Sequence, residues 1–188
     1  MVNKLKIFNN FNIPNKFKNS IILIGNFDGL HSGHQKLFEL AKKYKTKYKS
    51  KVGVVTFDPI PKMFFNKQIK NYRISNFNQK VIYLKKFGVD FVINKKFDKN
   101  FSKINYHKFI KDILSRKLKS KFIFVSNNFR FGNKREGDVS QLKKYENDFG
   151  YNLINPAPLI KNKKIISSTV IRKLLEEGKL LKANTFLK

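Results

Sequence analysis

Cysteine is missing from this 188-residue sequence, and so are long apolar runs and flexible spacers. Without cysteine the chain can form neither a disulfide framework nor a thiolate metal site, which excludes a small disulfide-stabilised secreted scaffold. Without a glycine- or serine-rich spacer, we expect one domain over residues 1–188. Asparagines interrupt the N-terminal segment, and no apolar run approaches the length of a membrane span. We therefore expect a cytoplasmic protein that makes no membrane contact.

Acidic residues are also scarce, because 12 Asp and Glu stand against 41 Lys and Arg, a formal net charge of +29. A field of this sign attracts nucleic acid, anionic lipid and phosphorylated metabolites. The lysines, however, are scattered through every segment, and they accompany many Phe, Ile and Asn residues, whose codons are rich in A and T. We interpret the charge as compositional drift that leaves a solvated basic surface, useful for collecting anionic substrates, rather than as a nucleic-acid interface.

Short apolar runs alternate along the chain with segments of helical periodicity, and the two patterns predict strands and helices respectively. The expected strands are 20–24, 52–57, 89–93, 121–125 and 151–154, with a short one closing at 165–166. The expected helices begin at Gly33, cover 77–87, run over 106–118 behind an Asn105 cap, extend over about 138–150, and follow a Ser168 cap with an interruption at Gly178.

This alternation predicts βαβ units and a mostly parallel sheet. The expected fold is α/β, a Rossmann-like, doubly wound sheet of five strands with helices on both faces. Ligands of such sheets bind at the carboxyl ends of the strands, near a topological switch point. The loops that begin at Gly25, Asp58, Ser126 and Ser167 are therefore the expected site.

The loop after the first predicted strand has the composition of a phosphate site. It reads G-N-F-D-G-L-H-S-G-H over 25–34 and leads into a helix. Its glycines permit a sharp turn and a close approach of ligand to backbone. The helix N-terminus offers free N–H groups, and His31 and His34 can donate hydrogen bonds to phosphate oxygens there. Two histidines can also bind zinc, but no cysteine and no carboxylate at ligand spacing accompanies them, so we reject that alternative.

This loop resembles the signature of the HxGH nucleotidyltransferase superfamily, and its F-D-G form resembles bacterial FAD synthetase, the FMN adenylyltransferase module. Three later segments are similar to motifs of that family, in the same order. They read T-F-D-P-I-P-K-M-F-F at 56–65, N-F-R-F-G at 128–132 with G-D at 137–138, and S-S-T-V-I-R at 167–172. Each later motif alone is weak, but four in order cover most of the chain. The resemblance implies the HxGH nucleotidyltransferase type of fold.

The resemblance also implies a reaction, in which ATP and FMN give FAD and pyrophosphate. An FMN phosphate oxygen would attack the α-phosphorus in line with the departing pyrophosphate, so catalysis rests on positioning and electrostatics. The implied catalytic residues are His31, His34 and Arg172. The implied ATP contacts are Gly25, Asn26, Phe27, Asp28, Gly33, Asn128, Ser168 and Thr169. The implied flavin contacts are Phe57, Pro59, Pro61, Phe64 and Phe129. Mg²⁺ is expected to arrive with ATP, and the sequence names no protein ligand for it.

The chain departs from the family pattern in places. Ile60 stands where the family usually has His, Ser126 and Asn127 replace Gly and an acidic residue, and Asn128 stands where Asp is commoner. Asn keeps hydrogen-bonding capacity but removes a charge. The typical bacterial enzyme continues into a riboflavin kinase domain, whereas this sequence stops at Lys188. We therefore expect adenylylation without riboflavin phosphorylation, with FMN supplied by a separate riboflavin kinase or by import.

Other functions remain consistent with the sequence. The chain could be another HxGH transferase that attaches AMP or CMP to a different phosphorylated acceptor, because the motif specifies the transfer chemistry better than the acceptor. It could also be a relic that binds flavin or nucleotide without catalysis, or a basic RNA-binding protein. The motif phenylalanines suit core packing as well as a planar ring, and the serines and arginine of 167–172 suit an ordinary helix cap with a surface arginine.

Overall fold

The computed structural model describes residues 5–69, 72–161 and 164–187. Its strands are β1 (Lys6–Phe8), β2 (Ile21–Ile24), β3 (Val52–Asp58), β4 (Phe91–Lys96), β5 (Phe122–Phe124), β6 (Asn152–Ile154), β7 (Ile160–Lys161) and β8 (Lys164–Ile165). Its longer helices are α1 (Ser32–Tyr48), α3 (Phe77–Lys86), the π-helix η2 (Phe109–Lys117), α8 (Ser168–Glu176) and α9 (Leu180–Leu187). The shorter ones are η1 (Asn15–Phe17), α2 (Pro61–Phe65), α4 (Lys99–Ser102), α5 (Tyr106–Lys108), η3 (Asn133–Arg135), α6 (Val139–Lys144) and α7 (Glu146–Phe149).

The central sheet is parallel throughout, with the strand order β1-β4-β3-β2-β5-β6, and β7 and β8 form a separate antiparallel pair. This arrangement confirms the predicted doubly wound α/β fold. The predicted number of five strands is wrong, because the sheet has six strands. The additional strand, β1, pairs with β4 at the edge, where Lys6 and Ile7 are exposed. An edge strand with exposed residues lacks the continuous apolar run of a buried parallel strand, so the hydrophobic pattern did not identify it.

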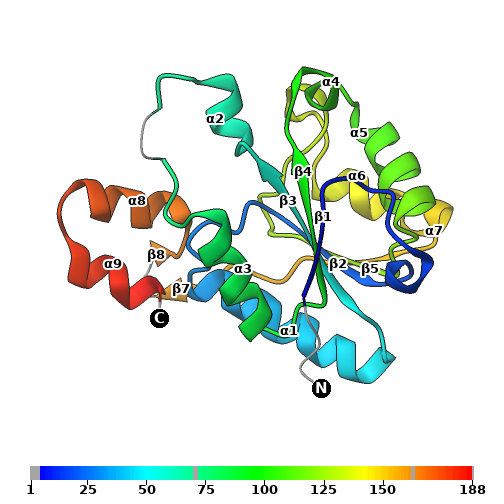
Figure 1. Cartoon of the computed structure of the whole chain (residues 1–188), viewed down its shortest axis with the longest axis horizontal. Helices are drawn as coiled ribbons and strands as arrows, with labels where there is room; N and C mark the ends of the chain where they lie inside the picture. The colour runs from blue at the N-terminus through cyan, green and yellow to red at the C-terminus, as the bar shows by residue number, and fades with distance from the viewer. Residues whose placement is uncertain (1–4, 70–71, 162–163, 188) are drawn as a thin grey trace.

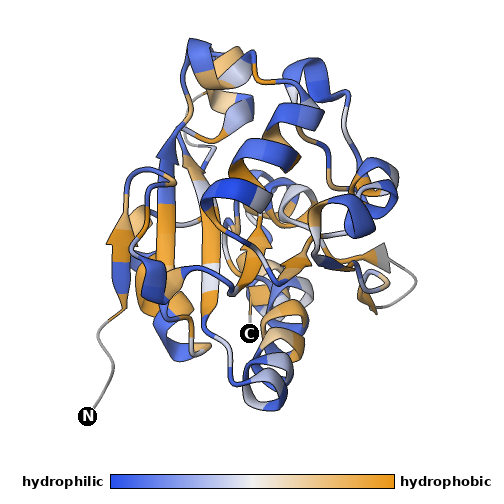
Figure 2. Ribbon diagram, turned by 90° about the vertical axis from the view of Figure 1, so that its right-hand side faces the viewer, coloured by the Kyte–Doolittle hydropathy of each residue, from blue (hydrophilic) through white to orange (hydrophobic). Residues whose placement is uncertain are grey.

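Helices cover both faces of the sheet (Figure 1). On one face, α1 and α3 bury Phe38 and Leu84 against the strands. On the other face, η2 and α6 bury Ile110, Leu114 and Leu142. Every residue of β2 is buried because it lies between these two cores, and β2 and β5 are accordingly apolar along their length. The polar residues of β3 and β4 lie toward the carboxyl ends of these strands, and the sheet is mainly orange in Figure 2.

Several helices differ in detail from the expectation. Asn105 does cap its helix, by accepting the backbone N–H of Lys108 at 2.7 Å, but most of that helix is the π-helix η2. The helix expected over about 138–150 is interrupted at Tyr145, which separates α6 from α7. The cap of α8 is Ser167, whose hydroxyl accepts the Val170 N–H, so the expected Ser168 cap is wrong by one position.

Strand order places the switch point next to β2. The chain adds β3 and then β4 on one side of β2, and later adds β5 and β6 on the other side. The loops that follow β2 and β5 therefore leave the carboxyl edge of the sheet at the place where ligands bind in such folds. Helices α8 and α9 pack together beside α1 and α3 (Figure 1). Within the described ranges, no helix has the length and apolarity that crossing a bilayer requires.

Candidate active site

The two histidines of the first motif lie at the start of α1. His31 is the N-cap residue of this 17-residue helix, and its Nδ1 atom accepts the backbone N–H of His34 at 3.4 Å. The imidazoles stack with ring centroids 3.7 Å apart. A helix N-terminus presents unpaired N–H groups and the positive end of the helix dipole, so both rings lie where an anion is favoured.

Both rings are uncharged at neutral pH. Burial lowers the pKa of His31 to about 4, with a further lowering from the Arg172 charge that outweighs the opposing effect of Asp28. Burial also lowers the pKa of His34 well below its usual value, and the charges of His31 and Lys80 add to this. A neutral imidazole carries one N–H, and because Nδ1 of His31 accepts a hydrogen bond, its proton is assigned to Nε2. His31 can therefore donate a hydrogen bond from Nε2.

The Asp28 side chain connects the histidine loop to two distant segments of the chain. Its carboxylate is 1% exposed and accepts the backbone N–H groups of Ile74 at 3.0 Å and Ser75 at 3.1 Å. It also accepts a hydrogen bond from Nη2 of Arg172 at 2.6 Å. A carboxylate with three strong donors is a connection between segments, so the nucleotide contact expected from this residue is left to its backbone.

Arg172 joins helix α8 to the histidine loop, residues 25–34. Beyond the ion pair with Asp28, its Nε donates to the Tyr72 carbonyl at 2.8 Å, and its guanidinium carbon lies 3.8 Å from the Tyr72 ring centroid. The Ser168 hydroxyl donates to the Asp28 carbonyl at 2.9 Å. These contacts bring the N-terminus of α8, with Ser168 and the exposed Thr169, to the loop that opens α1. The N-termini of α1 and α8 therefore lie next to each other.

Backbone strain is concentrated in the same loop. Phe27 and Leu30 have positive φ angles of 45° and 38°, an unfavourable conformation for residues with a side chain, and both side chains are buried in the core. Gly29 has a φ of 78°, and a Cβ there would lie 2.8 Å from Ile74. The group that approaches Gly29 closely is thus Ile74 of the same chain, whereas the sequence interpretation expected a ligand to approach the backbone of this loop.

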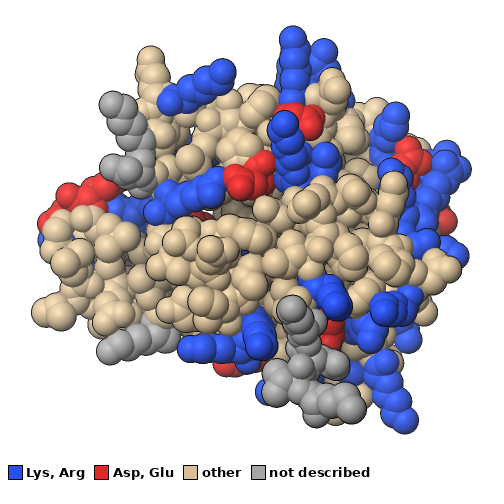
Figure 3. Space-filling model, in the orientation of Figure 1, with Lys and Arg blue, Asp and Glu red and all other residues tan. Residues whose placement is uncertain are grey.

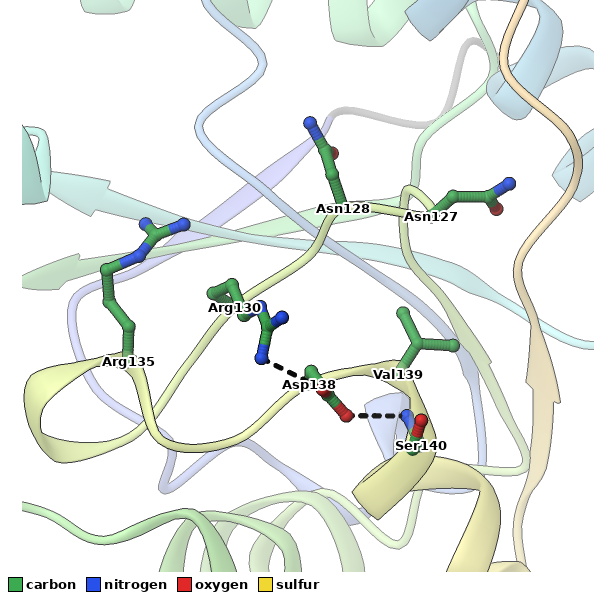
Figure 4. A pocket seen from close by; sticks show the side chains of 7 residues that line it. All are labelled: Asn127, Asn128, Arg130, Arg135, Asp138, Val139 and Ser140. Carbon is green, nitrogen blue, oxygen red and sulfur yellow. Dashed lines mark hydrogen bonds and ion pairs between the residues drawn. The ribbon is translucent and has the colours of Figure 1, made fainter.

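The Asn128 loop, residues 126–138, forms a second part of the carboxyl edge. A hollow of about 360 Å³ is lined by Asn127, Asn128, Arg130, Arg135, Asp138, Val139 and Ser140 (Figure 4). Arg130 pairs with Asp138 at 2.8 Å, and the Asn128 amide oxygen accepts the Ser126 hydroxyl at 2.9 Å. In Figure 4 the Asn128 side chain points away from the Arg130–Asp138 pair.

The residues expected to contact flavin fall into two groups. Phe57 and Phe64, from the segment that also contains Pro59 and Pro61, both lie against Phe97, with ring centroids 6.0 and 5.3 Å apart. Phe129 instead stacks on Phe131 at 5.4 Å. The structure thus places the predicted flavin residues in two aromatic clusters.

The departure at Ile60 has a structural counterpart. Ile60 is 3% exposed at the start of α2, so packing occupies the position where the family usually carries His.

The structure also adds residues that the sequence did not identify. Tyr72, Ile74 and Ser75 hold Asp28 and Arg172, and they follow no recognisable motif. Lys80, on α3, is buried beneath the loop, although its sequence context is that of an ordinary surface lysine.

Lys and Arg side chains occupy several separate areas of the face shown in Figure 3. Over residues 5–69, 72–161 and 164–187, no three His, Asp or Glu side chains are grouped so that they could hold a metal ion.

Comparison with known proteins gives a consistent family. The FAD synthetase family matches residues 13–170. The bifunctional riboflavin kinase/FMN adenylyltransferase of Buchnera aphidicola subsp. Acyrthosiphon pisum is 41% identical over 176 residues, which are 94% of this chain and 56% of that protein. The protein of the same name from Escherichia coli strain K12 is 34% identical over 167 residues, 89% of this chain and 53% of that protein. The chain spans about half the length of the curated relatives it matches.

A solved structure supports the fold independently. The crystal structure titled as a macrolide-efflux protein from Streptococcus pneumoniae matches with a TM-score of 0.83 at 26% identity. The match covers 96% of this chain and 59% of that one. The likeness in fold extends over nearly the whole chain.

Proposed function

The chain belongs to the FAD synthetase family, and from this membership and the geometry of the histidine loop we propose that it transfers AMP from ATP to FMN, releasing FAD and pyrophosphate. Residues 1–188 would act as one nucleotidyltransferase domain. The observation that carries the proposal is the stacked pair His31 and His34 at the N-terminus of α1, with the N-terminus of α8 and Arg172 beside it.

The proposed chemistry needs no general base. The FMN phosphate is ionised at neutral pH, and one of its oxygens forms a bond to the α-phosphorus of ATP as the bond from that phosphorus to the bridging oxygen of pyrophosphate breaks. Negative charge moves onto the leaving pyrophosphate during this step. The enzyme therefore contributes by fixing the two phosphates in line and by stabilising that charge.

The histidines suit that task because they are neutral donors. Nε2 of His31 donates one hydrogen bond, and the His34 ring lies against it at the positive end of α1. We assign both rings to the triphosphate, where hydrogen bonds that strengthen as charge develops lower the barrier. Arg172 is held in place by Asp28 and Tyr72, so it would meet phosphate without losing entropy at the moment of binding.

Recognition of the two ligands would fall to the flanking loops. We assign ATP contacts to the backbone of Gly25 to Asp28, to Gly33, and to the side chains of Asn128, Ser168 and Thr169. We assign flavin contacts to Phe57, Pro59, Pro61, Phe64 and Phe129, because partly buried aromatic rings in the loops that follow β3 and β5 suit a planar ring. Magnesium would enter with ATP, held mainly by phosphate oxygens, and would neutralise part of the phosphate charge.

The proposal is tested by incubating the 188-residue chain with ATP, FMN and magnesium and measuring FAD and pyrophosphate by chromatography. We expect the two products in equal amounts and none when FMN is omitted. ATP binding without FAD would contradict FMN as the acceptor. A different phosphorylated acceptor is then the next candidate, because the departures at Ile60 and Asn128 lie in the segments that would recognise it.

A further inference from the structure

Lys80 is the only buried lysine among the side chains that the structure describes, in a chain whose other lysines lie mostly at the surface. It is 6% exposed and shares the buried face of α3 with Leu84, one helical turn further on. An apolar residue would fit that face without cost, whereas burying an ammonium group is unfavourable unless the charge is compensated. Its position therefore requires a physical explanation.

The contacts of Lys80 place its ammonium group at the carboxyl edge of the sheet. Nζ donates to the Thr56 hydroxyl at 3.2 Å, near the carboxyl end of β3. That hydroxyl in turn lies 3.3 Å from the Asn26 carbonyl, in the histidine loop. The charge of Lys80 also acts on His34, whose pKa it helps to lower. Lys80 is thus linked through Thr56 to the backbone that we assign to the nucleotide, and its charge reaches the His34 ring.

Charges around this point do not balance within the described part of the chain. The carboxylates that act on Lys80 are Asp28 and Asp58, and each already pairs with an arginine, Arg172 and Arg73 respectively. Three cations therefore stand against two anions. Thr56 is the one hydrogen-bond partner of Nζ among the described residues, although an ammonium group has three donors. A cation with free donors and no anion is suited to an anion that arrives from solution.

We propose that Lys80 is the cation that receives a phosphate group of the nucleotide in this site. The inference rests on the proposed function only in taking a phosphate-bearing nucleotide as the ligand. The bound phosphate completes the charge balance that the protein groups alone do not reach, and in the dry interior a charge-assisted bond to it is stronger than at the surface. The cost of burying the ammonium group is offset when the ligand binds.

The first experiment compares Lys80→Met with Lys86→Met, an exposed lysine on the same helix, in the full 188-residue chain. Both variants remove one positive charge, so the general field of the protein changes equally. Calorimetric titrations would use ATP with magnesium and, separately, inorganic tripolyphosphate. We expect Lys80→Met to weaken both Kd values at least tenfold and Lys86→Met to stay within twofold. The melting temperature of Lys80→Met should stay equal or rise, because an apolar isostere replaces a buried ion. ATP affinity within twofold of wild type would overturn the proposal.

A second measurement follows the pH dependence of ATP binding by the wild-type chain. Burial lowers the pKa of Lys80 to about 8, a lowering that Arg73 adds to and that Asp28 and Asp58 oppose. The ammonium form is therefore complete below that pH and is lost as the pH rises through it, while His34 stays neutral throughout. ATP affinity of the wild type should fall on the order of tenfold between about pH 7.5 and 9.5, and Lys80→Arg should flatten the profile. A flat wild-type profile would contradict the assignment.

Binding rather than turnover is measured, so the two proposals fail separately. Lys80-dependent ATP binding without FAD formation would remove the FMN reaction and keep this assignment. FAD formation with Lys80-independent ATP binding would do the reverse.

Discussion

The loops that follow β2 and β5 flank the same switch point, yet they are held in different ways. The histidine loop is tied to segments far away in the sequence, since Asp28 bonds to Ser75 and to Arg172, and Ser168 bonds back to the Asp28 carbonyl. The loop that follows β5, residues 126–138, is held mainly by local contacts, from Ser126 to Asn128 and from Arg130 to Asp138, and much of its surface is exposed. One longer contact joins it to the Tyr106 N–H, which Glu136 accepts at 3.0 Å.

This difference matches the tasks that we propose for the two loops. Stabilising a charge that develops on a phosphate requires donors fixed before the reaction, and only long-range contacts can fix them against local motion. Recognising the rest of a nucleotide tolerates a loop that adapts, and local hydrogen bonds permit that. The comparison therefore predicts that equivalent substitutions will have unequal effects in the two loops.

The largest effect should come from His34→Ala. Removing a donor to the triphosphate should lower kcat for FAD formation about 100- to 1000-fold, and circular dichroism should show that the variant stays folded. His107→Ala, the third histidine of the chain, is the control, because it packs on Tyr145 and Phe149 on the opposite face of the sheet. Near-normal turnover of His34→Ala would remove our assignment of this residue.

Next in size is the pair Asp28→Asn and Asp138→Asn, which makes the same change in each loop. Asp28 and Arg172 form a buried pair, so neutralising one partner should lower the free energy of unfolding by about 3 kcal/mol or more. Asp138 and Arg130 are partly exposed, and their loss should cost below about 1 kcal/mol. Urea unfolding measures both, and equal losses would show that the two loops are held equally firmly.

A smaller effect should follow from acid. The pKa of His31 is about 4 when folded and near 6.5 when unfolded, so the unfolded chain binds the extra proton as the pH falls. Stability contributed by the neutral ring is therefore complete above about pH 6.5 and is lost below it, by about 2 kcal/mol between pH 7.5 and 5. Urea unfolding at both pH values should show at least this loss in the wild type, because the lowered pKa of His34 adds to it, and a loss smaller by about 2 kcal/mol in His31→Gln. An equal loss of stability in the wild type and in His31→Gln would mean that His31 is not buried as described.

The smallest effect should come from Asn128→Ala. Losing one hydrogen bond to the nucleotide from an open loop should raise the KM for ATP about five- to tenfold, equivalent to about 1 kcal/mol, without changing the free energy of unfolding. Asn152→Ala, an exposed asparagine on β6, is the matched control. An unchanged KM would place Asn128 outside the nucleotide site.

The elements and site residues that the sequence predicted well are those that depend on residues adjacent in the chain. Strand β2 and helix α1 follow from an apolar run and from helical spacing, and His31 and His34 are recognisable because a strand, a glycine-rich turn and a helix start follow one another directly. The edge strand β1 was not predicted, because its exposed residues give no continuous apolar run. Ser168 was one residue from the true cap, which backbone geometry decides.

The amino-acid sequence by itself determined the α/β fold, the position of the histidine pair at a helix N-terminus and the family, since these depend on periodicity and on motifs of adjacent residues. Only the tertiary structure decided that Asp28 pairs with Arg172 and that Lys80 is buried beside Thr56. It also decided that residue 29 has no room for a side chain, because Ile74 packs against it. In each case the partners are distant in sequence. These residues interact only after the fold has brought the carboxyl ends of the parallel strands to one edge of the sheet and has excluded water from it.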